Sequence, residues 1–222
     1  MHDGFHPPLE EYLEAVYELQ EEGTPVIQAR LAERLGHAPP SVSEMISRLR
    51  GDGFLEAEGR SLRLTSKGRK RAESVVRKHR LAERLLTDVI GLEWHKTHLE
   101  ACRWEHVISD EVEDRLVELL HHPTTCPHGN PIPGSGAPHT RDRRLKVLAD
   151  SAPGDQVRLE RVTEQVEIDL ESLTFLSEHG FIPGADARVA SRAADGTLTV
   201  EVGDDAIAVG PGLAQQLFVA AH

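Results

Sequence analysis

The first part of the chain repeats apolar residues at the spacing of one helix face. Between residues 9 and 22 these positions are Leu9, Leu13, Val16, Tyr17 and Leu19. A recurrence every three to four residues is typical of an amphipathic helix that packs one side on a core. The pattern therefore predicts a helix over residues 9–22, with Glu11 and Glu14 on its polar side.

Two shorter helices and a hairpin are expected next. Residues 27–35 carry a helical pattern that Gly36 ends, and Pro39-Pro40 opens a second helix that runs to Gly51. Segments 54–58 and 61–65, joined by Gly59-Arg60, have the character of two antiparallel strands. A helix, a tight turn, a second helix and a hairpin together predict a winged helix-turn-helix.

The rest of the chain divides into a helix pair, a linker and a strand-rich region. Helical patterns cover residues 66–86 and 94–120, on either side of a break at Gly91. Residues 123–152 are rich in proline and glycine, so we expect a linker without regular structure. Beyond it the pattern predicts one helix, at 170–179, and strands at 156–162, 187–193, 197–202 and 205–209. A small barrel accounts for these strands most simply.

The predicted fold class is mainly α with a small β domain. We expect four units along the chain: a winged helix-turn-helix at 1–72, a helical unit at 73–122, a Pro/Gly-rich linker at 123–154, and an SH3-like barrel at 155–222.

Charge is distributed unevenly among these units. The net charge of −12 argues against DNA binding at first, because DNA affinity depends largely on cations that neutralise phosphates. Residues 24–72, however, hold ten Lys or Arg against five Asp or Glu, whereas the two later parts of the chain are acidic. A basic head on acidic domains fits DNA binding combined with binding of a cation.

Composition also bounds the location. No apolar run approaches a membrane span, and the start of the chain lacks the features of a secretion signal, so we expect a cytoplasmic protein without a membrane partner. The two cysteines, Cys102 and Cys126, are too few for a disulfide framework. In a reducing compartment a thiol beside His and Glu is better explained as a metal ligand.

The second helix of a helix-turn-helix enters the major groove, where small residues at its start let the backbone approach the bases. Ser41 and Ser43 are candidates for contacts with base edges, and Pro40 for a thymine methyl. The four cationic candidates are expected to contact phosphate groups of the DNA backbone. The candidate DNA-binding residues are Ala38, Pro40, Ser41, Ser43, Arg48, Arg50, Arg60 and Lys67. A winged helix used only for protein contacts is the alternative.

Metal-ligating residue types recur at helical spacing in the middle of the chain. His98, Cys102, Glu105 and His106 fall at i, i+4, i+7 and i+8, on one helical stripe. His79 and Glu83 lie one turn apart on the preceding helix, and the first helix offers Glu11 and Glu14. Imidazole, thiolate and carboxylate together suit a first-row transition ion better than Ca2+ or Mg2+.

These motifs carry a family resemblance. The helix-turn-helix, the run from Arg77 to Leu86 and the run from Glu100 to His106 resemble the diphtheria toxin repressor family, and the likeness extends over residues 9–134 and more faintly to the C-terminus. The resemblance implies a metal-dependent transcriptional repressor that controls metal-homeostasis genes. It also implies a homodimer on a palindromic double-stranded operator, with up to two dimers per operator, a helical dimerisation domain with two metal sites, and a FeoA-like barrel.

Carried over residue by residue, the resemblance implies two ligand sets. The ancillary site would use His79, Glu83 and His98, and the primary site Cys102, Glu105 and His106. In the iron-sensing branch the barrel lends a carboxylate and an amide to the ancillary site, for which we expect Asp169 and Glu171, with Ser172 at the amide's position.

The first helix departs from the iron-sensing pattern. Glu11 stands where that branch has a methionine, and with Glu14 it resembles the paired acids of the manganese-sensing branch. That branch, however, has a glutamate where this chain keeps Cys102. Oxygen donors favour Mn2+ and the thiolate favours Fe2+ and later metals, so we expect Mn2+ or Fe2+, with a slight lead for Mn2+ and with Zn2+, Co2+ or Ni2+ as substitutes in vitro.

We therefore expect a switch rather than a catalyst. Metal bound between the first helix and the dimerisation helices would tether the DNA-binding head to the body and raise the fraction of molecules able to bind DNA. A metalloenzyme that activates water at the His/Cys/Glu cluster is one alternative. A metal-independent winged-helix regulator is another, and it would leave that cluster unexplained.

Overall fold

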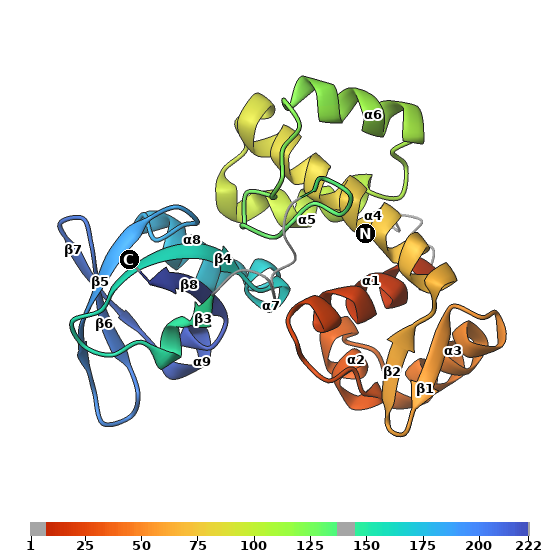
Figure 1. Ribbon diagram of the computed structural model, residues 1–222, viewed down its shortest axis with the longest axis horizontal. Helices are drawn as coiled ribbons and strands as arrows, with labels where there is room; N and C mark the ends of the chain where they lie inside the picture. The colour runs from red at the N-terminus through yellow and green to blue at the C-terminus, as the bar shows by residue number, and fades with distance from the viewer. Residues whose placement is uncertain (1–7, 137–144, 222) are drawn as a thin grey trace.

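The computed structural model describes residues 8–136 and 145–221, which form three lobes (Figure 1). The N-terminal lobe contains α1 (Pro8–Glu21), α2 (Gln28–Leu35), α3 (Pro39–Gly51), β1 (Leu55–Glu58) and β2 (Ser61–Leu64). Gly36 ends α2 in the left-handed conformation, with φ of 63°, and proline at the start of α3 fixes the next φ. The winged helix-turn-helix fold is confirmed.

The apolar stripe of α1 forms the core of this lobe. Leu13, Val16 and Leu19 pack with Leu31 of α2 and Leu49 of α3. Because the apolar face of α1 is used in this way, Glu10 and Glu14 are left on the side that meets the middle lobe.

Helix α4 (Ser66–Arg84) connects the N-terminal lobe to the middle lobe. It begins at Thr65, whose hydroxyl accepts a hydrogen bond from the Gly68 amide at 3.1 Å, and it continues as a π-helical turn, η1 (Leu85–Ile90). Its first half packs on α1 and its second half on α5. One continuous element therefore carries residues of the middle lobe to a fixed position beside the DNA-binding lobe.

The prediction of a single helix over 94–120 is wrong. This segment consists of a 3-10 turn, η2 (Trp94–Lys96), then α5 (Thr97–Trp104) and α6 (Asp110–Leu119). α5 ends at Trp104, and residues 105–109 form a turn and a short irregular segment. The Ser109 hydroxyl then caps α6 by accepting from the Val112 amide at 3.3 Å. His106 therefore follows the end of α5 instead of extending its stripe.

The expected linker contains a packed loop. Residues Cys126 to Ile132 are buried, and a bridge joins Thr125 to Pro131. Arginines on α4 hold the loop through its carbonyl groups: Arg77 donates to Pro133 at 2.6 Å, Arg80 to Pro131 at 2.5 Å and Arg84 to Thr125 at 2.7 Å. Part of the predicted linker, 137–144, lies outside the described residues.

The C-terminal lobe is a six-stranded barrel with the strand order β3-β8-β4-β5-β6-β7. Its elements are β3 (Lys146–Val147), η3 (Leu148–Asp150), β4 (Gln156–Val162), α7 (Glu164–Glu167), α8 (Leu170–Glu178), β5 (Asp186–Arg192), β6 (Leu198–Val202), β7 (Asp205–Val209), α9 (Pro211–Ala214) and β8 (Leu217–Ala221). The sequence pattern missed β3 and β8, although β8 pairs with β4 at the centre of the sheet. Helix α7, which directly follows β4, points toward the other lobes (Figure 1).

None of the helices in the described ranges combines the length and the apolar character that crossing a membrane requires.

Gly129 gives a test of the packed loop. It has a φ of +88°, and a Cβ added there would lie 1.9 Å from the Glu160 carbonyl oxygen of β4. We expect Gly129→Ala to lower the free energy of unfolding by roughly 3 kcal/mol, because left-handed strain and a backbone clash add together. Gly154→Ala is the matched control: its φ is +97° but the space around it is open, so a loss of roughly 1 kcal/mol is expected. Equal losses in urea unfolding would contradict the packing of the loop on β4.

Candidate metal centre at the junction of the lobes

Helix α4 brings two predicted ligands to the place where the three lobes meet. His79 and Glu83 lie one turn apart on α4, and both are buried. His98 of α5 is buried as well, with its Nδ1 3.2 Å from the His79 Nε2. These side chains stand at the centre of two groups of donors, which we call the α1 cluster and the loop cluster.

The α1 cluster joins the DNA-binding lobe to the middle lobe. One donor atom each from Glu14, His79 and Glu105 lie within 4.8 Å of one another. The His79 Nδ1 is 2.5 Å from a Glu105 oxygen, and the His106 Nε2 is 3.0 Å from the other. Cys102 lies beside this group, since its sulfur forms a second set with His79 and His98. The structure thus gathers five predicted ligands: Glu14, His79, Cys102, Glu105 and His106.

The first helix contributes a different pair of acids from the predicted one. Glu10, which the sequence analysis did not select, has a carboxylate oxygen 2.6 Å from the His106 Nδ1 and also pairs with Arg71. Glu11 is not among the donor groups that the described residues form. Glu10 and Glu14 lie one helical turn apart, so they share the face of α1 that meets the middle lobe.

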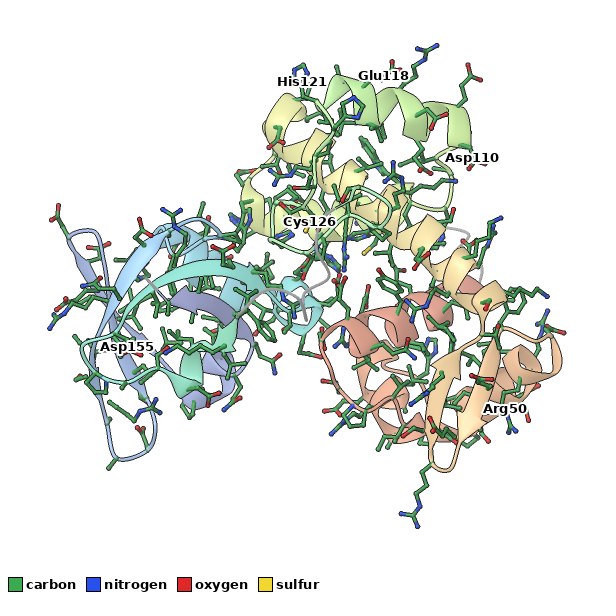
Figure 2. All side chains as sticks on the ribbon, in the orientation of Figure 1. Arg50, Asp110, Glu118, His121, Cys126 and Asp155 are labelled. Atoms are coloured by element: carbon green, nitrogen blue, oxygen red, sulfur yellow. The ribbon has the colours of Figure 1, made fainter. Side chains whose placement is uncertain are left out.

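The loop cluster joins the middle lobe to the packed loop and the barrel. Its donors are Glu83, Cys126, His128 and Glu167, whose ligand atoms lie within 4.8 Å of one another. The His128 Nδ1 is 2.9 Å from Glu83 and 3.1 Å from Glu167. Figure 2 shows Cys126 in the middle lobe, near the point where the lobes meet.

Helix α7, rather than α8, supplies the carboxylates of the barrel. The His98 Nδ1 lies 3.1 Å from Glu164 and 3.3 Å from Glu167. The expected Asp169 and Glu171 lie outside the donor groups of the described residues. The exposed Asp169 carboxylate caps α8 by accepting from the amides of Glu171 and Ser172, and Glu171 is exposed. The reason is that Asp169 starts α8, whereas the one-turn helix α7 faces the junction.

Burial and mutual pairing shift the protonation of these groups strongly. Burial alone would lower the pKa of His79, but the carboxylates of Glu83 and Glu105 raise it well above its usual range. Burial would likewise lower the pKa of His128, but the carboxylates of Glu167 and Glu83 raise it well above its usual range. Despite its burial, Glu105 has its pKa lowered to about 2 by His79 and His106.

The two cysteines differ. Burial would raise the pKa of Cys102, but His98 and His79 lower it to about 7, which favours the thiolate that binds metal. Burial and the nearby Glu83 and Glu167 carboxylates raise the pKa of Cys126 to about 12. A cation within the loop cluster would reverse this repulsion, because it attracts the thiolate directly.

The loop cluster has unused ligand atoms. Within the described residues, the Glu83 Oε2 and the His128 Nε2 are buried and form no hydrogen bond. Unsatisfied buried polar atoms are costly, so their presence beside a thiol indicates a site built for a ligand. Outer contacts orient the donors, as in protein metal sites: the Asn130 amide donates to Glu167 at 2.5 Å, and the Trp94 ring packs on His128. The residues present fit a first-row divalent metal ion.

Sequence reasoning missed Glu10, Cys126, His128, Glu164 and Glu167. The signal for two of them was Cys126-Pro127-His128, a thiol and an imidazole two residues apart, which the proline and glycine content of the segment concealed. The signal for the barrel pair was two acids three residues apart, Glu164 and Glu167, directly after a strand.

The predicted DNA-binding residues are exposed on the N-terminal lobe. Ala38, Pro40, Ser41, Ser43, Arg48, Arg50 and Arg60 are exposed, and Figure 2 shows Arg50 on the outer side of this lobe. Lys67 is exposed too, but its ammonium already donates to the Asp52 carbonyl at 2.8 Å and lies 4.0 Å over the Phe54 ring.

Comparison with known proteins agrees with this arrangement. Three family models match in order: the iron-dependent repressor N-terminal DNA-binding domain at residues 5–61, the iron-dependent repressor metal-binding and dimerisation domain at 65–134, and the FeoA domain at 146–221. The chain belongs to the iron-dependent repressor family. The iron-dependent repressor IdeR of Mycobacterium tuberculosis is 45% identical over 205 residues, which cover 88% of this chain and 89% of that protein.

Two further relatives are a second repressor protein and a solved structure. The diphtheria toxin repressor of Corynebacterium efficiens is 46% identical over 187 residues, with 81% of each chain covered. A solved manganese-dependent transcriptional repressor in complex with manganese superposes with a TM-score of 0.86 at 28% identity, over 96% of this chain and 100% of that one. The resemblance drawn from the sequence motifs is confirmed.

The raised pKa values of the histidines predict a pH dependence of metal binding. Metal binds neutral imidazole, so His79, His98 and His128 must lose protons that their carboxylate neighbours stabilise. Lower pH favours the protonated imidazoles, which cannot bind the metal. The apparent metal affinity should therefore increase as the pH is raised, by about tenfold per pH unit for each proton released. Calorimetric titration with Mn2+ in buffers of different ionisation enthalpy measures the number of protons.

His179 provides the control for this measurement. It lies in the barrel, 3.6 Å from Asp205 and outside both clusters. His179→Ala should release as many protons as the unaltered chain. Metal binding without proton release would contradict the role of the three buried histidines.

Proposed function

We propose that this chain is a metal-activated transcriptional repressor that binds operator DNA as a homodimer when loaded with Mn2+ or Fe2+ and controls metal-homeostasis genes in the cytoplasm. The observation that carries the proposal is the α1 cluster. In it a carboxylate of the DNA-binding lobe, Glu14, lies with His79 and Glu105 of the middle lobe. Ligand binding there acts on the position of the head itself.

The ligands proposed for the first metal site are Glu14, His79, Cys102, Glu105 and His106. A bound divalent ion supplies positive charge on which donors from separate elements converge. Glu14 belongs to α1, whose opposite face is the core of the DNA-binding lobe, so fixing Glu14 fixes that lobe. Desolvation raises the pKa of the half-buried Glu14 most, and repulsion by the buried Glu105 carboxylate raises it further. This repulsion opposes closure of the head on the body.

The ligands proposed for the second metal site are Glu83, His98, Cys126, His128, Glu164 and Glu167. They come from α4, α5, the packed loop and α7, so this site holds the barrel and the loop against the middle lobe. His79 and Glu83, which lie 3.4 Å apart, connect the two sites. Metal binding at one site therefore fixes α4, which also carries a ligand of the other site. We expect the two sites to bind metal cooperatively.

Metal choice follows from the donors. Carboxylates outnumber thiols in both clusters, which suits Mn2+, whereas Cys102 and Cys126 add the softer donors that favour Fe2+ and later ions. The Mn2+ and Fe2+ branches of the family are both represented among the relatives, so we propose both ions as activators.

For the dimer we propose the exposed apolar residues of the middle lobe. Val89 and Ile90 of η1 are 56% and 55% exposed, and Leu99 of the neighbouring α5 is 47% exposed. Such residues close together on a domain described as a dimerisation domain fit a self-complementary contact. A two-fold axis there would present two copies of α3, as a palindromic operator requires, and two such dimers on one operator are a further possibility within this proposal.

Glu14→Gln tests the tether. The variant keeps the shape of the side chain but weakens a donor, so metal activation of operator binding should fall at least about tenfold, which corresponds to about 1.4 kcal/mol. Glu11→Gln is the matched control on the same helix, and in it the metal activation of operator binding should fall less than in Glu14→Gln. Fluorescence anisotropy of a palindromic operator, selected from genomic fragments by the metal-loaded protein, gives both values across Mn2+ and Fe2+ titrations. DNA binding that is equally strong with and without metal would overturn the proposed function.

Replacing Ser41 and Ser43 by Ala tests the reading face. Because contacts with base edges specify a sequence while phosphate contacts only position the protein, we expect operator affinity to fall much more than affinity for random DNA. The metal affinity of this variant should be unchanged, since both serines are exposed on α3. A parallel loss on operator and random DNA would show that α3 does not read the bases.

A further inference from the structure

Helix α1 reaches the turn of the helix-turn-helix through one hydrogen bond. The Tyr12 hydroxyl lies 3.0 Å from the Nδ1 of His37, and the two ring centroids are 5.7 Å apart. Tyr12 is only 2% exposed, and it lies on α1 between Glu10 and Glu14, which face the α1 cluster. The same helix thus carries metal-site acids and a contact with the DNA-reading unit.

His37 occupies a defined place in that turn. It follows Gly36, which ends α2, and its backbone amide donates to the Ala32 carbonyl at 3.1 Å. Ala38, the N-cap of α3, comes next, and Ala38, Pro39, Pro40 and Ser41 are all exposed. The backbone of His37 is therefore fixed by the end of α2, and its exposed ring is fixed by Tyr12.

The direction of this bond corresponds to the tautomer of the His37 ring. When the Tyr12 hydroxyl is the donor, the His37 Nδ1 is the acceptor, as the unprotonated nitrogen of an imidazole can be. The ring proton of neutral His37 then resides on Nε2. In the part of the chain that the structure describes, the only hydrogen bond of this ring is the one to Tyr12, so the Nε2–H remains available on the surface beside the start of α3.

We propose that Tyr12 is a positioning residue that couples α1 to the reading helix and holds His37 so that its Nε2–H donates to a phosphate oxygen of the operator. The inference rests on the proposed function. A phosphate is the expected acceptor because the turn before the recognition helix runs beside the DNA backbone, while the following residues of α3 reach the bases. A shift of α1 at the metal site then moves the phosphate contact and the start of α3 together.

Two single variants and their combination test the coupling. Tyr12→Phe removes only the hydroxyl, and His37→Ala removes the donor. Each should weaken metal-activated operator binding by about tenfold, since a dimer loses one hydrogen bond in each half-site. The double variant should be no weaker than His37→Ala, because both changes break one chain of contacts. Mn2+ affinity should be unchanged in all three.

Two further measurements separate this role from simple packing. His37→Gln keeps an N–H donor at the position of Nε2 and should recover most of the operator affinity that His37→Ala loses. Phosphate ethylation should interfere with binding at one position per half-site in the unaltered chain, and this interference should disappear in His37→Ala. Nitrogen-15 NMR of the histidine rings should show the Nε2–H tautomer of His37 in the unaltered chain and a mixture in Tyr12→Phe.

The outcomes are distinguishable. If the unaltered chain shows metal-activated operator binding but Tyr12→Phe and His37→Ala bind as well as it does, the inference is overturned and the proposed function stands. Additive losses in the double variant, or an ethylation pattern that His37→Ala leaves unchanged, also overturn it. If the unaltered chain shows no metal-activated DNA binding, the proposed function and this inference fail together.

Discussion

The structure depends on a buried array of opposite charges at the meeting point of three lobes. Glu83, Glu105 and Glu167 are almost completely buried, and they are tolerable there only because His79, His98 and His128 lie within 4 Å of them. Removing such groups from water costs free energy, and none of the helices and loops that carry them could bury its charged groups without the opposite charges of its neighbours. These buried charge pairs therefore couple the lobes at their junction.

Helix α4 makes this array possible because its faces serve different partners. His79 and Glu83 face the donors of α1, α5 and the loop, while Arg77, Arg80 and Arg84 hold carbonyl groups of the loop. Arg80 also pairs with Glu21 at the end of α1, at 2.7 Å. The helix consequently fixes the distance between the end of α1 and the loop.

The end of α1 extends this coupling to the barrel. Arg34 of α2 pairs with Glu18 of α1 and with Glu22, the residue that follows α1. The backbone of Glu164 on α7 forms a hydrogen bond with Glu22. A helix of the DNA-binding lobe thus contacts the middle lobe at its start and the barrel at its end. This arrangement gives the barrel a direct physical route to the position of the reading helix.

By itself the sequence determined the elements with strong local signals and the ligands that share a helix. The periodicity of α1, the Gly36 and Pro39 boundaries of the helix-turn-helix, and the pairs His79 with Glu83 and His98 with Cys102 all follow from spacing along one element. Only the tertiary structure decided which acids of α1 and of the barrel lie beside these histidines, and it places Glu10 next to His106 and Glu164 and Glu167 next to His98. The reason is that such contacts depend on how separate elements are oriented relative to one another. A shift of one residue along an element turns a side chain to a different face, and local propensity does not encode that orientation. The loop of Cys126 and His128 shows the same limit, because arginines 40 to 50 residues away hold it in place.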